Sequence, residues 1–193
     1  MSRPVASDLP AHVAALADAV SEIERHVSRA GWDGDIRVFA LITTRDALAA
    51  DPAVADQLPA ATVEAALHDP HHLTSVEQEN LPAVDSLEEL LGSIVWPATV
   101  AGCAVVTERV ILPPSAEDGI PDDPTAALAY VSTHPERQDV RIAVGVLRRG
   151  SSWCAIRTRD NDDDLDVAHG PTLVPSLIEA VRTTLAEDSS DTY

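Results

Sequence analysis

Apolar residues recur at steps of three and four positions between residues 10 and 29. They are Val13, Leu16, Val20, Ile23 and Val27. This spacing places them on one stripe of an amphipathic helix, which Gly31 ends. The same periodicity predicts a second long helix near the C-terminus, from Leu173 to Leu185.

Shorter helices are indicated by their N-terminal signals. Ser86 and Glu89 have the spacing of a capping box, in which each side chain satisfies a free backbone N–H of the other's residue, and they predict a helix over residues 87–95. Asp123 or Thr125 can cap a helix that runs to Val131. Two short helical stretches are expected on either side of Pro52.

Runs of branched apolar residues predict the strands. Residues 36–42 form one strand, and residues 99–112 are apolar on both alternating faces, as expected of a strand in the middle of a sheet. The polar stretch 59–82 is expected to contain one exposed strand at residues 73–79. Residues 113–124 hold four prolines and are expected to form a solvated connection.

A hairpin is predicted from residues 140–147 and 151–158, joined by Arg148-Arg149-Gly150. Three-residue loops of this kind close on a left-handed residue, for which Gly150 is suited. This loop sets a register in which Arg141 lies opposite Arg157 and Gly145 opposite Trp153. The other face of the hairpin stays apolar in both strands, which a shift by one residue would destroy.

This order of elements predicts an α+β fold. Strands separated by unequal helical pieces favour a mainly antiparallel β-sheet with helices packed on it, ending in a C-terminal hairpin and a C-terminal helix. The chain has 193 residues and is expected to form a single domain over residues 1–193, with flexible ends at residues 1–9 and 187–193.

The net charge of the chain limits the classes of partner that it is expected to bind. All 13 basic residues are arginines, and they face 32 acidic residues, so the formal net charge is −19. Such a surface repels phosphate backbones and anionic lipid, so neither nucleic acid nor a membrane is an expected partner. The sequence shows no apolar run long enough to span a bilayer and no signal peptide, which predicts a cytoplasmic location.

The hairpin region departs from this negative charge. Six arginines lie between residues 137 and 159, against the single acid Asp139. Because Arg141 and Arg157 face each other across the strands, their like charges need an anionic counterpart. The acidic loop at residues 160–166 can fold back and supply it, or an external anion can bind there with Trp153 as its apolar anchor.

The predicted binding residues are therefore Arg141, Trp153, Arg157 and Arg159. The first hypothesis is a non-enzymatic binding or accessory protein, chaperone-like or regulatory, that binds a protein or acidic peptide through an exposed patch. The alternative is a sensor or enzyme that binds a small anionic molecule with the same residues. A concave pocket favours the small ligand, and a flat patch favours a protein partner. Charge reversal, Arg157→Glu, is expected to weaken binding and leave the fold intact.

Other chemistry is weakly indicated. The loop at residues 160–166 begins like a calcium loop, but Leu165 stands where glycine is needed and Pro171 where the bidentate glutamate is needed, which leaves at most weak cation binding. The histidines at residues 68–72 lack a partner pair for zinc. Cys103 and Cys154 lie in apolar runs and are expected to be buried and free, which removes Cys154 as a nucleophile activated by His169. No catalytic residue, metal or cofactor is expected.

Several short motifs are shared with a known family. They are Val76-Glu77-Gln78-Glu79-x-Leu81-Pro82, Trp96-Pro97, Glu108-Arg109 before Leu112-Pro113-Pro114, Arg137-Gln138-Asp139-Val140-Arg141, Ser152-Trp153-Cys154 and Leu173-Val174-Pro175. On these motifs, nearly the whole chain resembles an uncharacterised conserved family of cytosolic actinobacterial proteins. The resemblance implies a single-domain α+β architecture and carries no activity, cofactor or catalytic residue.

Overall fold

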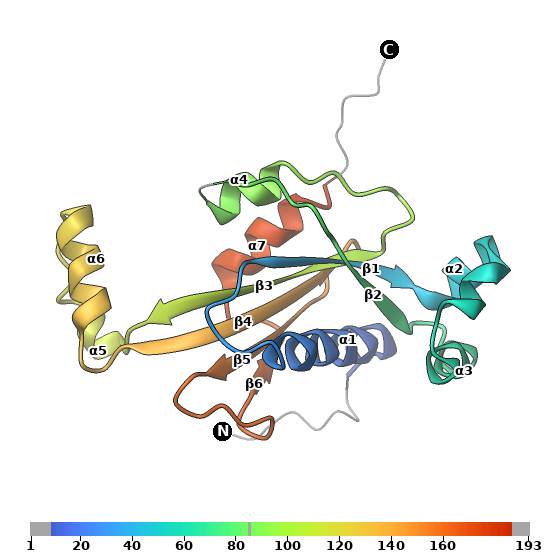
Figure 1. The fold of residues 1–193 in the computed structure, drawn as a ribbon, viewed down its shortest axis with the longest axis horizontal. Helices are drawn as coiled ribbons and strands as arrows, with labels where there is room; N and C mark the ends of the chain where they lie inside the picture. The colour runs from blue at the N-terminus through green and yellow to red at the C-terminus, as the bar shows by residue number, and fades with distance from the viewer. Residues whose placement is uncertain (1–8, 85, 187–193) are drawn as a thin grey trace, which may run out of the picture.

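A six-stranded antiparallel sheet forms the centre of the protein in the computed structural model, which describes residues 9–84 and 86–186 (Figure 1). The strand order is β2-β1-β3-β4-β5-β6, and every neighbouring pair is antiparallel. The strands are β1 Arg37–Thr43, β2 Leu73–Glu77, β3 Gly102–Ile111, β4 Gln138–Leu147, β5 Ser152–Thr158 and β6 Ala168–Gly170. The α+β class is confirmed, and so is the central place of β3.

Helices cover both faces of this sheet and extend beyond its two ends. They are α1 Ala11–Ser28, α2 Thr44–Ala50, the 3-10 helix η2 Pro52–Asp56, α3 Ala60–His68, α4 Leu87–Gly92, α5 Pro114–Glu117, α6 Pro124–Thr133 and α7 Pro175–Thr183. Helix α1 packs on one face and α7 on the other, with α4 beside α7. Figure 1 shows α5 and α6 beyond the far ends of β3 and β4, and α2 and α3 at the opposite side of the molecule.

The sheet therefore separates two hydrophobic cores. On one face, the stripe of α1 packs against side chains of β1, β3, β4 and β5. On the other face, α4 and α7 pack against the alternate residues of the same strands. Gly145 allows α1 to approach closely, because a Cβ atom there would lie 2.4 Å from Cγ2 of Val20. Both faces of the C-terminal hairpin are consequently buried.

The register of that hairpin is confirmed pair by pair. Arg141 lies opposite Arg157 and Gly145 opposite Trp153, as the loop length predicted. Gly150 has a φ angle of 92°, the left-handed conformation that closes the loop. Local rules sufficed here because a tight turn determines the pairing of the strands beside it.

Local signals also placed most helices. Ser86 accepts a hydrogen bond from the backbone N–H of Glu89, which is one half of the predicted capping box, and Asp123 accepts one from Ala126, so both N-caps are confirmed. Helices α3 and α5 and strand β6 were missed. The last two span one turn and three residues, too short to show a period, and α3 buries only one residue, Ala66.

The predicted flexible ends fall almost entirely outside the described residues. Of residues 1–9, only Leu9 is described, and it packs partly buried against the core beneath α1. Among the described residues, none of the helices combines the length and the apolar character needed to cross a bilayer.

Candidate functional site

The Arg157 side chain lies inside the protein and not on its surface. Only 2% of the residue is exposed, because α1 covers this face of the hairpin. Its Nε and Nη2 donate to the two carboxylate oxygens of Glu24 at 2.6 and 2.9 Å. Nη2 also donates to Asp164 at 2.6 Å and Nη1 to Asp162 at 3.2 Å. The acidic loop thus folds back onto Arg157, as the internal explanation predicted.

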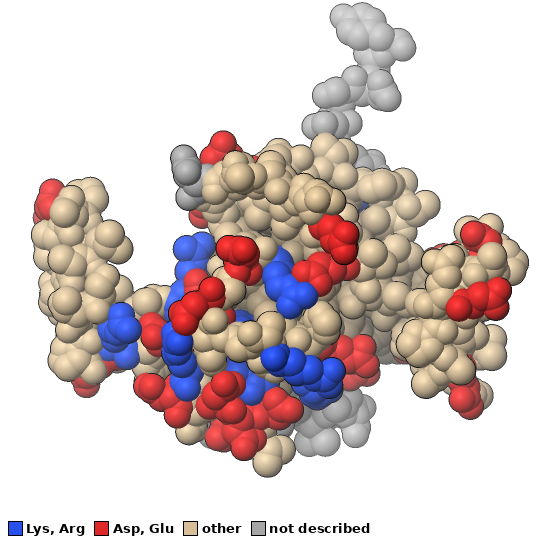
Figure 2. Space-filling view, viewed as in Figure 1, with Lys and Arg blue, Asp and Glu red and all other residues tan. Residues whose placement is uncertain are grey.

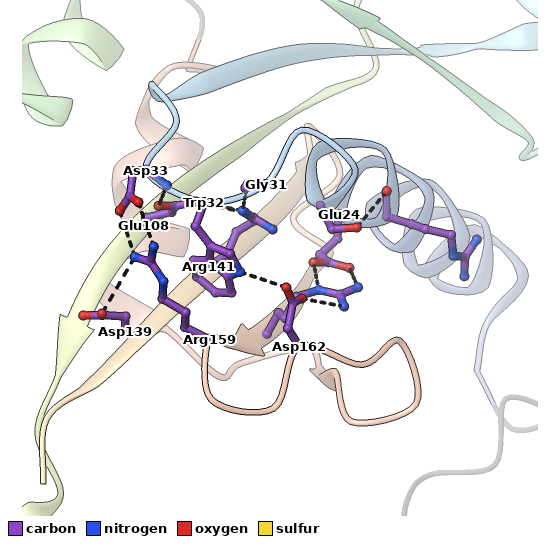
Figure 3. A network of polar contacts seen from close by, with 12 residues as sticks. Glu24, Gly31, Trp32, Asp33, Glu108, Asp139, Arg141, Arg159 and Asp162 are labelled. Carbon is purple, nitrogen blue, oxygen red and sulfur yellow. Dashed lines mark hydrogen bonds and ion pairs between the residues drawn. The ribbon is translucent and has the colours of Figure 1, made fainter.

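Arg141 is also buried, with 1% of the residue exposed. Its guanidinium group lies over the ring of Trp32 at 4.4 Å (Figure 3). Its Nε and Nη2 donate to Oε1 of Glu108 at 3.2 and 2.8 Å, and Nη2 also donates to the carbonyl of Gly31. The third nitrogen, Nη1, is buried and has no hydrogen-bond partner among the described residues. Buried donors are rarely left this way in folded proteins.

Arg159 and the buried carboxylate of Glu24 lie on opposite sides of Trp32 (Figure 3). Arg159 donates to both carboxylate oxygens of Asp33 at 2.8 and 2.7 Å, and its guanidinium group is 5.5 Å from the Trp32 ring (Figure 3). These hydrogen bonds lower the pKa of Asp33. With 40% of its side chain exposed, Arg159 is the one predicted binding residue of the four that reaches solvent.

The predicted exposed patch of Arg141, Trp153, Arg157 and Arg159 is therefore wrong as a surface. Trp153 is 6% exposed and belongs to the core beneath α1. The alternation of the hairpin identified this face correctly, but contact with a helix more than 120 residues earlier in the chain is invisible in local spacing. Figure 2 shows arginines and acids intermingled over the middle of the molecule.

Sequence reasoning missed three acids of the network: Glu24, Asp33 and Glu108. For Glu24 a signal was present, because positions 20, 23, 24 and 27 share one helical stripe and the other three are apolar. An acid within a buried stripe requires a buried partner. For Asp33 and Glu108 the sequence holds no such signal, because their contacts join the loop after α1 to β3 and to Arg159, the residue after β5.

A hollow of about 1250 Å³ adjoins Arg141 at the edge of the sheet, and we call it the edge hollow. Its wall is formed by residues from three segments, 27–37, 77–90 and 106–109, together with Arg141. Arg37 crosses the wall and donates to both oxygens of Glu77 at 2.5 Å. Arg109 is exposed on this wall and has no ion pair among the described residues.

The two thiols do not line this hollow and belong to the core beneath α4 and α7. Cys103 and Cys154 are buried and free, as predicted. Burial raises the pKa of Cys103 to about 11 and also raises that of Cys154, so neither is a thiolate at neutral pH. Within residues 9–84 and 86–186, no three His, Cys, Asp or Glu side chains are grouped as a metal site.

The ion pairs predict how stability depends on pH. Hydrogen bonds from Arg37 lower the pKa of Glu77, and hydrogen bonds from Arg157 lower that of Asp164. A carboxyl whose pKa is lower in the folded state stabilises the fold above its ordinary pKa, and this contribution is lost as pH falls through the folded value. We therefore expect the urea midpoint to fall as pH drops below about 4.

The matched comparison is Arg37→Gln, which removes the cause of the Glu77 shift. This variant should lose less stability than the wild type over the same acid range. An equal loss of stability in Arg37→Gln and in the wild type would contradict Arg37 as the cause of the lowered pKa of Glu77.

The fold and the site define an α+β protein in which a helix-covered antiparallel sheet buries an arginine–carboxylate network beside an edge hollow. The sequence profile of a family described as PPA1309-like protein matches residues 16–186, and the chain belongs to this family. This confirms the membership in a conserved family that the shared motifs predicted. Comparisons with curated proteins and with solved structures found no match.

Proposed function

We propose that this protein is a non-enzymatic accessory protein that binds a segment of a partner protein in the edge hollow. The observation that carries the proposal is the edge hollow, lined in part by Arg141, whose Nη1 is a buried donor without an acceptor among the described residues. An unpaired buried donor costs about 1–3 kcal/mol, and an acceptor oxygen from a bound chain would remove that cost.

The composition of the wall supports a polypeptide ligand. Ile36, Leu81 and Pro82 give it apolar surface, and the polar amides of Gln78 and Asn80 lie beside them. Concave sites that combine apolar surface with a few polar groups are typical of ligand binding. A polypeptide supplies both apolar side chains and carbonyl acceptors, so one ligand matches both kinds of surface.

A small anionic molecule is the second candidate, and Arg109 favours it because its charge is unpaired. Two exposed acids on the same wall, Asp35 and Glu88, would repel a bound anion. The positive charges of Arg37 and Arg141 do not offset this repulsion, because these arginines are already paired with Glu77 and Glu108. The formal charge of −19 also disfavours the approach of a free anion. The polypeptide is therefore the better match.

Selection from a phage-displayed library of random peptides about 12 residues long tests the proposal. We expect peptides that bind the wild type and lose at least about tenfold in affinity for Ala83→Trp, because this side chain would enter the hollow from an exposed position on its wall. Fluorescence anisotropy of labelled peptides measures the affinity.

Ala50→Trp is the matched control, since Ala50 is exposed at the end of α2, outside the hollow. It should bind the selected peptides as the wild type does, with both variants folded by circular dichroism. Failure to select any peptide that distinguishes the two variants would contradict the proposal. Stabilisation of the wild type by inorganic phosphate or citrate alone, lost in Arg109→Gln, would favour the small anion instead.

The proposed location is the cytoplasm of an actinobacterium. Two free, buried thiols agree with a reducing compartment. The absence of lysine among 193 residues agrees with the composition of a high-GC genome.

A further inference from the structure

Strand β3 is longer than its neighbour β1. Residues 102–106 pair with β1, and this pairing ends where Arg37 lies opposite Val106. All ten residues of β3 pair with β4 on the other side. Residues 107–111 therefore have a strand on one side and, among the described residues, none on the other. Figure 1 shows this free part of β3 running past the start of β1.

The hydrogen-bond pattern identifies which backbone groups face that open side. The N–H of Gln78 donates to the carbonyl of Val38, so the backbone groups of Val38 face β2. Because these directions alternate along an antiparallel strand, Arg37 faces β3 and its partner Val106 faces β1. The same alternation turns the N–H and C=O groups of Glu108 and Val110 to the open side.

These four backbone groups have no hydrogen-bond partner among the described residues. The edge hollow includes residues 106–109, and a second hollow of about 300 Å³ includes residues 108–110. The branched side chains at the end of the strand are also accessible, with Val110 39% and Ile111 41% exposed. An open edge with branched side chains is a template for another strand.

We infer that the partner segment is extended and adds to residues 107–111 of β3 as an antiparallel strand. This inference rests on the proposed function and names the form of its ligand. The N–H and C=O groups of Glu108 and Val110 then pair with the main chain of the segment. The segment continues the line of β1 and runs in the same direction, so its carboxyl-terminal side enters the edge hollow beside Arg37 and Arg141.

Side chains on β3 determine the sequence of the segment. Arg109 is exposed and unpaired, so the residue opposite it is acidic. A branched apolar residue opposite Ile111 covers the accessible side chain there. The side chain of Glu108 does not require a basic residue on the segment, because Arg141 and the backbone N–H of Asp33 already donate hydrogen bonds to its carboxylate.

N-methylation of each backbone nitrogen in turn, in the tightest library peptide that Ala83→Trp fails to bind, tests strand addition. Methylation at alternate positions should lower affinity at least about tenfold, and methylation at the positions between them should change it less than about twofold. This period of two follows because every second N–H of an added strand faces β3. Equal sensitivity at neighbouring positions would overturn the inference.

Variants of the protein give an independent measurement. Val110→Pro removes the N–H on the open side and should abolish binding of the same peptide, whereas Val110→Thr keeps the N–H and should retain it. Arg109→Glu should exchange the preference for acid at one peptide position for a preference for lysine, by about two- to fivefold in affinity. Absence of this exchange would overturn the predicted register.

The two proposals fail in different ways. Hollow-dependent binding without the alternating pattern overturns strand addition and leaves the proposed function standing. The lack of any hollow-dependent peptide overturns the proposed function and, with it, strand addition.

Discussion

Replacement of Arg157 by methionine is expected to lower the free energy of unfolding by about 3–5 kcal/mol. The change leaves the carboxylate of Glu24 buried without its partner, since only 3% of each side chain is exposed. Two further carboxylates, Asp162 and Asp164, lose a hydrogen bond, but water reaches both. Urea denaturation followed by circular dichroism measures the effect.

Two comparisons make this test specific. Arg159→Met removes an ion pair to an exposed carboxylate and should lower the free energy of unfolding far less than Arg157→Met does. The double variant Glu24→Leu with Arg157→Met removes both buried charges and should recover much of the loss. A loss below about 1 kcal/mol for Arg157→Met would contradict the burial of this pair. Because position 157 is buried, Arg157→Glu would place two carboxylates together in the core, and we do not expect this variant to keep the fold intact.

Truncation of Trp153 to alanine is expected to cost about 3–5 kcal/mol, because it leaves a cavity between α1 and the sheet. Trp153 lies opposite Gly145, where Val20 and Leu16 of α1 lie close to the strands. Its indole nitrogen is buried without a hydrogen-bond partner among the described residues, so Trp153→Phe gives up no such bond and should cost much less.

Trp153→Ala and Trp153→Phe together distinguish a packing role of Trp153 from a role in peptide binding. Both should keep the affinity of the wild type for hollow-dependent peptides, because Trp153 is not part of the edge hollow. Chemical denaturation and the anisotropy assay give the two readouts. Unchanged stability of Trp153→Ala together with lost peptide binding would restore Trp153 as a binding residue.

The network explains why arginines concentrate on one hairpin of an acidic protein. Arg157 joins β5 to α1 and to the acidic loop, and Arg141 joins β4 to β3 and to the loop after α1. Planar guanidinium groups suit this work because each can donate to several acceptors at fixed angles. Of the two, only Arg141 retains a donor that nothing in the described part of the chain satisfies.

The edge hollow and the open side of β3 are formed by segments that lie far apart in the sequence, and no local pattern connects these segments. The wall combines the loop after α1, the chain between β2 and α4, and the end of β3. In the sequence, residues 99–112 read as one central strand; the structure has a strand from Gly102 to Ile111, with a strand on both sides only as far as Val106. That β1 stops there, and leaves Glu108 and Val110 without a neighbour, depends on where the preceding loop turns away.

The amino-acid sequence by itself determined the antiparallel α+β class, the long helices and the hairpin register, because these depend on periodicity, caps and a tight turn within short stretches of chain. It also indicated that the arginines of the hairpin need an anionic counterpart. Only the tertiary structure decided which carboxylates these are and that α1 buries the arginines beneath it. Glu24 and Arg157 are 133 positions apart, and burial depends on the summed packing of distant elements, which local spacing does not encode.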